Sequence, residues 1–137
     1  MDNGEWIMVN GDFKLMDMKE NIIKTKSFAL ALRIIILYQF LQIEKKEFIL
    51  SKQLLRCGTS IGAMVRESEQ AESKMDFIHK LAIAQKEANE TEYWIELLHQ
   101  SGYLDKQQYE SIFQDITEIR KLLASIIKTS KVNRESK

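Results

Sequence analysis

Apolar side chains recur at alternating steps of three and four residues through most of this chain, and no proline interrupts its 137 residues. This spacing stacks side chains along one stripe of an α-helix. Four segments each carry such a stripe, here called the seam. The four seams are Ile23, Ser27, Leu30, Ile34, Leu37 and Leu41; Leu54, Cys57, Ile61, Met64, Ser68 and Ala71; Phe77, Leu81, Ala84, Ala88, Thr91, Ile95 and Leu98; and Tyr109, Ile112, Ile116, Ile119, Leu123 and Ile126. The pattern predicts an all-α, antiparallel up-down four-helix bundle with helices at about 20–42, 51–72, 74–101 and 106–131.

The connections between these segments carry helix-end signals. Ser73 with Asp76 and Asp105 with Gln108 have the spacing of capping boxes, and Gly102 suits the end of the third helix. Residues 1–19 lack a seam, so we expect a flexible N-terminal tail, although its apolar cluster at residues 6–9 could dock on a groove or a neighbouring subunit. The bundle then spans residues 20–131, and residues 132–137 form a C-terminal tail.

Composition and cysteine usage indicate a cytoplasmic protein. The lone Cys57 cannot form an internal disulfide, which fits a reducing compartment. The amino terminus has no basic segment followed by an apolar core, so it does not resemble a secretory signal. The longest uncharged run, at residues 34–43, is well short of the roughly 20 residues that cross a bilayer. We therefore expect a soluble protein without a membrane partner.

No catalytic or metal-binding constellation is predicted. Glu96 with His99 has the Glu-x-x-His spacing of di-iron bundles, and Asp76 with His79 echoes it. Both pairs lie on one predicted helix, about 30 Å apart and off the seam, whereas a di-metal site needs such pairs on facing helices. Cys57 lies on a seam and is expected to be a small core residue. We predict no enzyme activity, no catalytic residue, no metal and no cofactor.

Two glycines stand four residues apart inside the second predicted helix. Gly58 and Gly62 cost about 1 kcal/mol each relative to alanine in a helix, so a close approach of another helix is expected to offset the loss. The stretch lacks the Gly-Lys-Ser/Thr ending of a phosphate loop. The third helix offers small residues for such an approach, namely Ala82, Ala84 and Ala88.

Two helices carry apolar residues away from their seams. The first is apolar nearly all round, and the third has a second apolar cluster some 80–140° from its seam. Soluble monomers rarely expose large apolar patches, so this pattern predicts a homo-oligomer. The alternative is that other parts of the same chain, such as the N-terminal tail, cover them. The predicted interface residues are Phe28, Leu32, Ile35, Ile36, Ile83, Tyr93, Trp94 and Leu97.

Charge is balanced overall but unevenly distributed. Twenty basic and twenty acidic residues give no net charge, yet residues 21–60 hold seven basic against two acidic side chains and residues 61–100 hold four against eight. Solvated faces and cations at a helix end explain much of this. A composite basic patch that holds phosphates is the other hypothesis. Few aromatic residues accompany these cations, so base stacking is not expected to dominate. The candidate nucleic-acid-binding residues are Lys45, Lys46, Lys52, Arg56, Lys128, Lys131 and Arg134.

One stretch of sequence resembles a known family. The run at residues 53–63, QLLRCGTSIGA, followed by residues 76–84, DFIHKLAIA, resembles the bacterial four-helix-bundle family found in intervening sequences of 23S ribosomal RNA genes and often called ribosomal-protein-like. The resemblance covers about residues 20–131. It implies an up-down bundle that assembles as a ring-like homopentamer with no established enzymatic activity.

The same family is similar to the accessory proteins of diversity-generating retroelements. Those proteins form basic pentameric barrels that contact nucleic acid and a reverse transcriptase, so the resemblance implies RNA, DNA or such a protein as a partner. Met64 departs from the family pattern, which usually has Asn after Ala63. We expect a non-enzymatic oligomeric adaptor that binds RNA or DNA through phosphates. The alternative is a protein-interaction scaffold with no nucleic-acid role.

Overall fold

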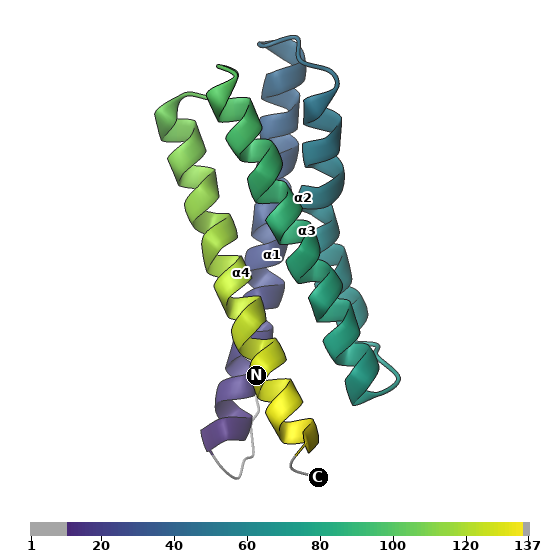
Figure 1. Ribbon diagram of the computed structural model, residues 1–137. Coiled ribbons are helices and arrows are strands. Elements are labelled where there is room, and N and C mark those ends of the chain that lie inside the picture. Colours follow the sequence, from purple (N-terminus) through teal and green to yellow (C-terminus); the bar gives the residue numbers. More distant parts are fainter. Residues whose placement is uncertain (1–10, 136–137) are drawn as a thin grey trace.

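Four helices pack side by side in the computed structural model, which describes residues 11–135, with side chains described for residues 16–133. They are α1 (Gly11–Ile43), α2 (Leu50–Ser68), α3 (Lys74–Gln100) and α4 (Lys106–Glu135). Each helix packs against the next along the chain, and α4 returns to α1 (Figure 1). The diagonal pairs, α1 with α3 and α2 with α4, do not pack together. The predicted all-α up-down bundle is thus confirmed.

The seams of the four helices form the core. Ile34, Leu54 and Ile116 are fully buried, as are most other seam residues, because the seams of all four helices converge on one axis. Helix α2 departs from the prediction at Met64 and at Val65, the second of which was not predicted to lie on the seam. Met64 is only half-buried at the edge of the core, and Val65 is buried beside it. Met64 thus packs against the core from its edge.

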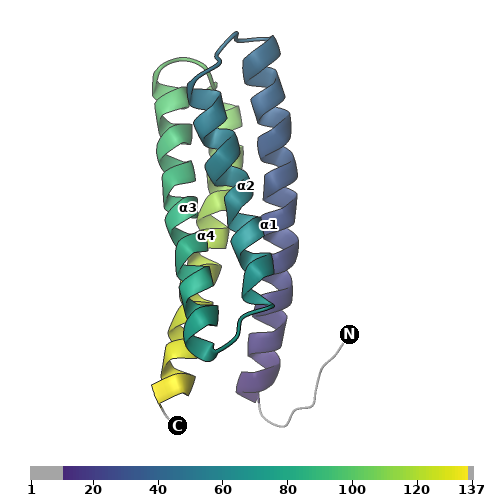
Figure 2. The ribbon, with the colours of Figure 1, turned by 90° about the vertical axis from the view of Figure 1, so that its right-hand side faces the viewer.

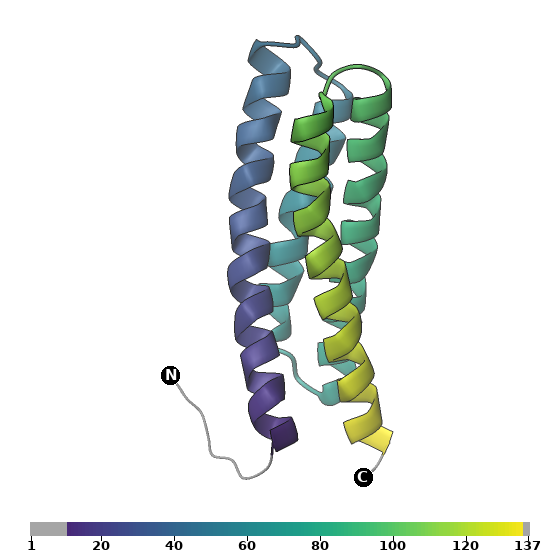
Figure 3. The same ribbon diagram turned by 90° about the vertical axis from the view of Figure 1, so that its left-hand side faces the viewer.

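The first and last helices, α1 and α4, are longer than predicted. Helix α1 begins at Gly11 because the seam continues: Met16, seven residues before Ile23, is buried, and Lys19 Nζ donates a 2.6 Å hydrogen bond to Ser125 Oγ on α4. Residues 11–19 are therefore helix and not tail, and α4 likewise extends to Glu135. Both helices run past the α2–α3 connection (Figures 1 and 3). The predicted docking cluster at residues 6–9 lies outside the described residues.

Capping interactions fix the connections. Ser73 Oγ accepts a 3.0 Å hydrogen bond from the Asp76 N–H at the start of α3. Asp105 and Gln108 form a reciprocal box at the start of α4, with N···O distances of 2.7 and 3.0 Å. Gly102 adopts a φ of +91°, which a residue without Cβ tolerates. These contacts confirm the predicted caps. Helix α2 ends at Ser68, before the expected residue 72, because the N–H groups of Glu69, Gln70 and Ala71 bond to carbonyl groups three residues back, in turns and not in α-helical bonds.

The two helix glycines contact α1 and not α3. A Cβ atom on Gly58 would lie 2.8 Å from Ile34 Cγ1, and one on Gly62 would lie 3.3 Å from the Ser27 carbonyl oxygen. The prediction that alanines of the third helix receive them is wrong, because the glycines lie on the side of α2 that faces α1. Ala84 and Ala88 are buried core residues, whereas Ala82 is exposed. The glycines allow α1 and α2 to pack closely along their length (Figure 2).

Helix α1 is unusually apolar for a bundle helix. By length and composition, Met16–Ile43 would suffice to cross a membrane, with a mean hydropathy of 1.4 over its most apolar 18-residue window. The sequence prediction considered only the longest run without any charged residue, which is too short to cross a bilayer. Met16–Ile43 reaches the required length because its window may include charged residues. In the bundle, Lys26 and Arg33 of this helix pair with Glu118 and Asp115 of α4. Only 22% of the window is buried, so much of its apolar surface faces outward.

Candidate functional site

The histidines and the cysteine do not form a reaction centre. The His99 ring stacks on Tyr109 with centroids 4.3 Å apart, and its Nδ1 lies 3.0 Å from the Leu104 carbonyl oxygen, so it supports the α3–α4 connection. His79 is exposed. Burial raises the pKa of the Cys57 thiol to about 11, so the thiol is protonated at neutral pH. Among residues 16–133, no three potential metal ligands of the His, Cys, Asp and Glu types lie together.

A small acidic pocket lies near the α2–α3 connection. Its volume is about 90 Å³, and Asp17, Glu20 and Glu69 are among the residues that line it. Burial, and then the neighbouring Asp17, raise the pKa of Glu20 above its usual value, whereas Lys74 lowers it. Lys24 binds Glu69 at 3.3 Å. The pocket therefore holds the Glu20 carboxyl group in a setting that disfavours its charged form.

Exposed apolar residues cover one side of α1. Phe28, Leu32, Ile35 and Ile36, here called the α1 apolar face, are 53, 50, 38 and 66% exposed. All four were predicted to lie outside the core, and the structure places them there. Their exposure leaves an apolar surface that nothing in the described part of the chain covers.

A second apolar surface lies on α3. Tyr93 and Leu97 are exposed and Ile83 and Trp94 are half-buried; these four form the α3 apolar face. Tyr93 packs edge-on against Trp94 with ring centroids 5.1 Å apart, and Trp94 Nε1 donates a 3.2 Å hydrogen bond to Glu90. Because α1 and α3 are diagonal in the bundle, the two apolar faces belong to different sides of the molecule.

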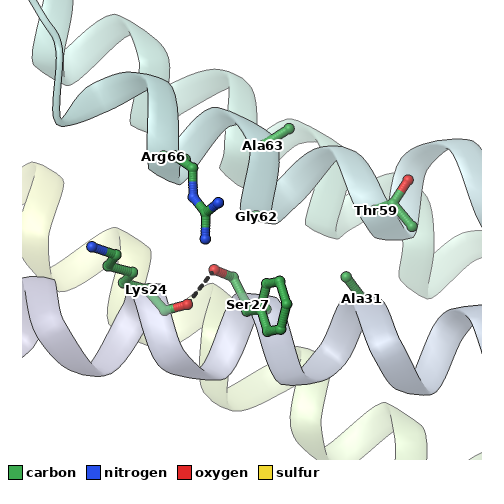
Figure 4. A pocket seen from close by; sticks show the side chains of 8 residues that line it. Lys24, Ser27, Ala31, Thr59, Gly62, Ala63 and Arg66 are labelled. Atoms are coloured by element: carbon green, nitrogen blue, oxygen red, sulfur yellow. Dashed lines mark hydrogen bonds between the residues drawn. The ribbon is translucent and has the colours of Figure 1, made fainter.

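A groove of about 330 Å³ runs beside the α1 apolar face, between α1 and α2. Arg66 extends from α2 toward α1 across it (Figure 4), and its guanidinium lies 5.8 Å from the centre of the Phe28 ring. Among the described residues Arg66 forms no ion pair. The lining residues are Lys24, Ser27, Phe28, Ala31, Thr59, Gly62, Ala63 and Arg66.

The predicted basic residues do not converge within one chain. Lys45, Lys46 and Lys52 lie at the α1–α2 connection, whereas Lys128 and Lys131 lie in the last turns of α4, at the opposite end of the bundle (Figure 1). The 22 residue steps from Lys106, at the start of α4 beside the α1–α2 connection, to Lys128 span about 33 Å of helix. The Arg134 side chain lies outside the described residues.

Arg56 differs from the predicted lysines because it is already paired. Its guanidinium contacts Glu90, and Nη1 lies 3.5 Å from Glu87 Oε1, both on α3. These carboxylates are two of the acidic side chains of the third helix, so ion pairs between α2 and α3 already satisfy part of the charge contrast in the sequence. A single continuous basic patch from all seven predicted residues is therefore absent from the described part of one chain.

The α1–α2 connection carries exposed apolar residues that the sequence interpretation missed. Ile43, Phe48 and Ile49 are 64, 49 and 75% exposed, and they alternate with Lys45, Lys46 and Lys52. Residues 43–52 are here called the tip. The signal was available in the sequence, since two apolar residues follow a Lys-Lys pair in a connection where no seam accounts for them.

Glu47 holds the tip in one conformation. Its buried carboxylate accepts hydrogen bonds from the N–H groups of Ile49, Leu50 and Ser51, at 3.1, 3.0 and 2.7 Å. Burial alone would raise the pKa of Glu47, but these backbone hydrogen bonds outweigh it and lower the pKa. Ser51 Oγ donates a 2.8 Å hydrogen bond back to the Glu47 carbonyl oxygen. Glu47 thus satisfies the free N–H groups at the start of α2.

These features define a class: an all-α four-helix-bundle protein whose candidate sites are exposed surfaces. Comparison with known proteins gives the family. The chain belongs to the 23S rRNA-intervening sequence protein family, whose model matches residues 19–125. It is similar to a protein of unknown function from the S23 ribosomal protein family of Bacteroides thetaiotaomicron, with 63% identity and a TM-score of 0.80 over 80% of this chain and 98% of that one. No curated protein matches.

Proposed function

We propose that this protein is a non-enzymatic, cytoplasmic, oligomeric adaptor whose copies associate through the α1 apolar face. The exposure of Phe28, Leu32, Ile35 and Ile36 is the observation that carries the proposal. Burying a large apolar side chain contributes about 1.5–3 kcal/mol, and contiguous exposed patches of this kind mark interaction sites. A second copy of the chain supplies a suitable cover.

The α3 apolar face of the next copy is the proposed partner of the α1 apolar face. Tyr93 and Trp94 are the residue types that dominate interface energetics, and the groove beside Phe28 can receive protruding side chains. Since the two faces lie on different sides of the bundle, the proposed contact is head-to-tail, and the ring is the closed assembly that such a contact can form. Five copies is the number that the family resemblance implies.

The lysines of the tip are the proposed contact for RNA or DNA. In a ring whose axis runs parallel to the helices, the tips of all copies lie on the same rim. The three lysines of each tip then add up to a larger basic surface in the assembly. Lys128 and Lys131 gather on the opposite rim. The family resemblance implies RNA or DNA as the ligand, and RNA is the one tested below. Contacts to phosphate give affinity that falls steeply with salt and depends little on sequence.

Fluorescence anisotropy against a structured RNA at two salt concentrations tests this function. The variant Lys45→Glu/Lys46→Glu/Lys52→Glu is expected to lose binding. The charge-matched control Lys74→Glu/Lys86→Glu/Lys121→Glu reverses three exposed lysines outside the candidate binding residues and is expected to retain most of it. An absence of binding at low salt, or binding insensitive to salt, would contradict the nucleic-acid role.

A protein-interaction scaffold is the second candidate function. The separation of the basic residues to two ends, and the pairing of Arg56 with Glu87 and Glu90, favour it. A protein partner such as a reverse transcriptase would then bind the ring, and nucleic acid would be irrelevant. A pull-down in the presence of nuclease, comparing the full chain with a variant that lacks residues 1–10, separates docking by the N-terminal segment from docking by the bundle.

A further inference from the structure

The tip combines exposed apolar side chains with cations in a fixed loop. Glu47 anchors it through three backbone hydrogen bonds, and Gln42 Nε2 donates a further one to Ser51 Oγ at 3.2 Å. Lys46 has a φ of +55°, a left-handed conformation that a lysine adopts only where the surrounding contacts impose it. The outward placement of Phe48 and Ile49 is therefore built into the loop and is not a consequence of a loose connection.

The location of the tip suits an extended partner. The α1–α2 connection projects beyond the α3–α4 connection at the same end of the bundle, as all three views show (Figures 1, 2 and 3). A projecting surface of this kind can contact a strand that passes over it. Two tips from facing rings would bring their lysines together, and the repulsion disfavours another copy of the chain as the occupant.

The chemistry of the tip distinguishes a single strand from a duplex. Lys45, Lys46 and Lys52 form no ion pair among the described residues, so they are available for phosphates. A duplex would satisfy these cations, but it would leave Phe48, Ile43 and Ile49 in water because its bases are stacked inside. Unpaired bases offer π-faces to an exposed phenyl ring and apolar contact to the isoleucines.

We infer that the tip binds unpaired nucleotides of RNA, with a base stacked on Phe48 and the flanking phosphates held by Lys45, Lys46 and Lys52. This inference rests on the proposed function, which assigns only phosphate contacts to the same lysines. It also revises the expectation that stacking is unimportant, since that expectation counted aromatics in the sequence and missed the position of Phe48. The lysines supply affinity for any strand, and Phe48 supplies the preference for unpaired bases.

Anisotropy titrations of the full chain with a 12-nucleotide oligouridine and with an RNA duplex of equal length test the inference. Phe48→Leu, which keeps an apolar side chain without the ring, is expected to weaken oligouridine binding about tenfold and to leave duplex binding and the salt dependence unchanged. Phe48→Trp is expected to retain binding, and its added fluorescence, measured against the wild type, is expected to be quenched by the oligonucleotide. Circular dichroism checks that both variants keep the fold, and particle mass checks that they keep the assembly.

Three outcomes would overturn the inference. Equal affinity for single strand and duplex, with Phe48→Leu unchanged, would remove the stacking role and leave the proposed function intact. Binding of neither RNA would remove the proposed function as well; binding of phosphatidylglycerol vesicles in that case would assign the tip to a lipid surface. A tighter complex with 12-nucleotide oligothymidine than with oligouridine would assign it to DNA.

Discussion

Gly58 sets the distance between α1 and α2. Alanine there gains about 1 kcal/mol in helix propensity, but its Cβ would meet three side-chain atoms of Ile34 at 2.8–3.0 Å. Because Ile34 is branched at Cβ and fully buried, it cannot move aside easily. We predict that Gly58→Ala lowers the free energy of unfolding by about 1–2 kcal/mol, measured by urea denaturation. A variant as stable as the wild type would show that the helices are not in close contact at this position.

Cys57 illustrates how the core suppresses side-chain chemistry. Its pKa of about 11 lies above the usual thiol value of 9.0, so the unfolded thiol ionises first as the pH rises. The contribution of this buried, protonated thiol to the free energy of unfolding is complete below the pKa of the unfolded chain. It is lost as the pH rises from about 9 to about 11.

We predict that the Cys57 thiol of the folded protein resists labelling by a disulfide reagent at pH 8 and reacts fully after unfolding in guanidinium. Ellman's reagent measures both rates. Rapid labelling without denaturant would place the thiol at the surface and contradict its assignment to the core.

At the scale of the helix, Glu47 determines how α2 begins. Its pKa is lowered in the folded state, so its contribution to stability is complete above the usual carboxyl range and is lost as the pH falls through the folded value. Glutamine keeps the shape but not the charge. We predict that Glu47→Gln costs about 1 kcal/mol at pH 7.

The acid limb of the stability profile provides the check for Glu47. The difference between Glu47→Gln and the wild type is expected to shrink as the pH falls and the wild-type carboxylate becomes protonated. Glu118→Gln, at an exposed ion pair with Lys26, serves as a control and is expected to change stability little. A Glu47→Gln penalty that is the same at pH 7 and in acid would contradict the capping role of the charge.

Spacing rules predicted the elements well because they depend on residues near one another in the chain. The seams and the boxes at Ser73 and Asp105 required only local sequence. The helix that Gly58 contacts could not be predicted from spacing. A seam shows that a position faces the inside of the bundle, but not which of the neighbouring helices it contacts. The first turns of α1 were missed because a single seam residue, Met16, extends the pattern among acidic residues.

The candidate site was predicted only in part, for a related reason. The apolar faces could be found because α1 and α3 carry more apolar residues than one seam needs. The pairing of Arg56 with Glu87 requires knowledge of which sides of α2 and α3 face each other. Phe48 was not predicted because a connection between helices has no regular spacing of apolar residues. An additional apolar residue there cannot be recognised from the pattern.

At the scale of the whole molecule, the proposed assembly rests on two apolar faces that lie on different sides of the bundle and that no described residue covers. A substitution in the middle of one face tests the contact without disturbing the core. Ile36 is among the most exposed residues of the α1 apolar face, so Ile36→Lys leaves the seam intact. We predict that this variant keeps its helical circular dichroism signal and dissociates into single chains. A fold lost along with the assembly would place Ile36 in the core.

The mass of the wild-type protein in dilute solution, measured by light scattering after size exclusion, tests the central claim most directly. One chain has a mass of 16.1 kDa. We predict a single species of several chains, close to five times that mass if the family resemblance holds. A single soluble species of 16.1 kDa would show that one chain is stable in solution with both apolar faces exposed, and it would contradict the proposed ring.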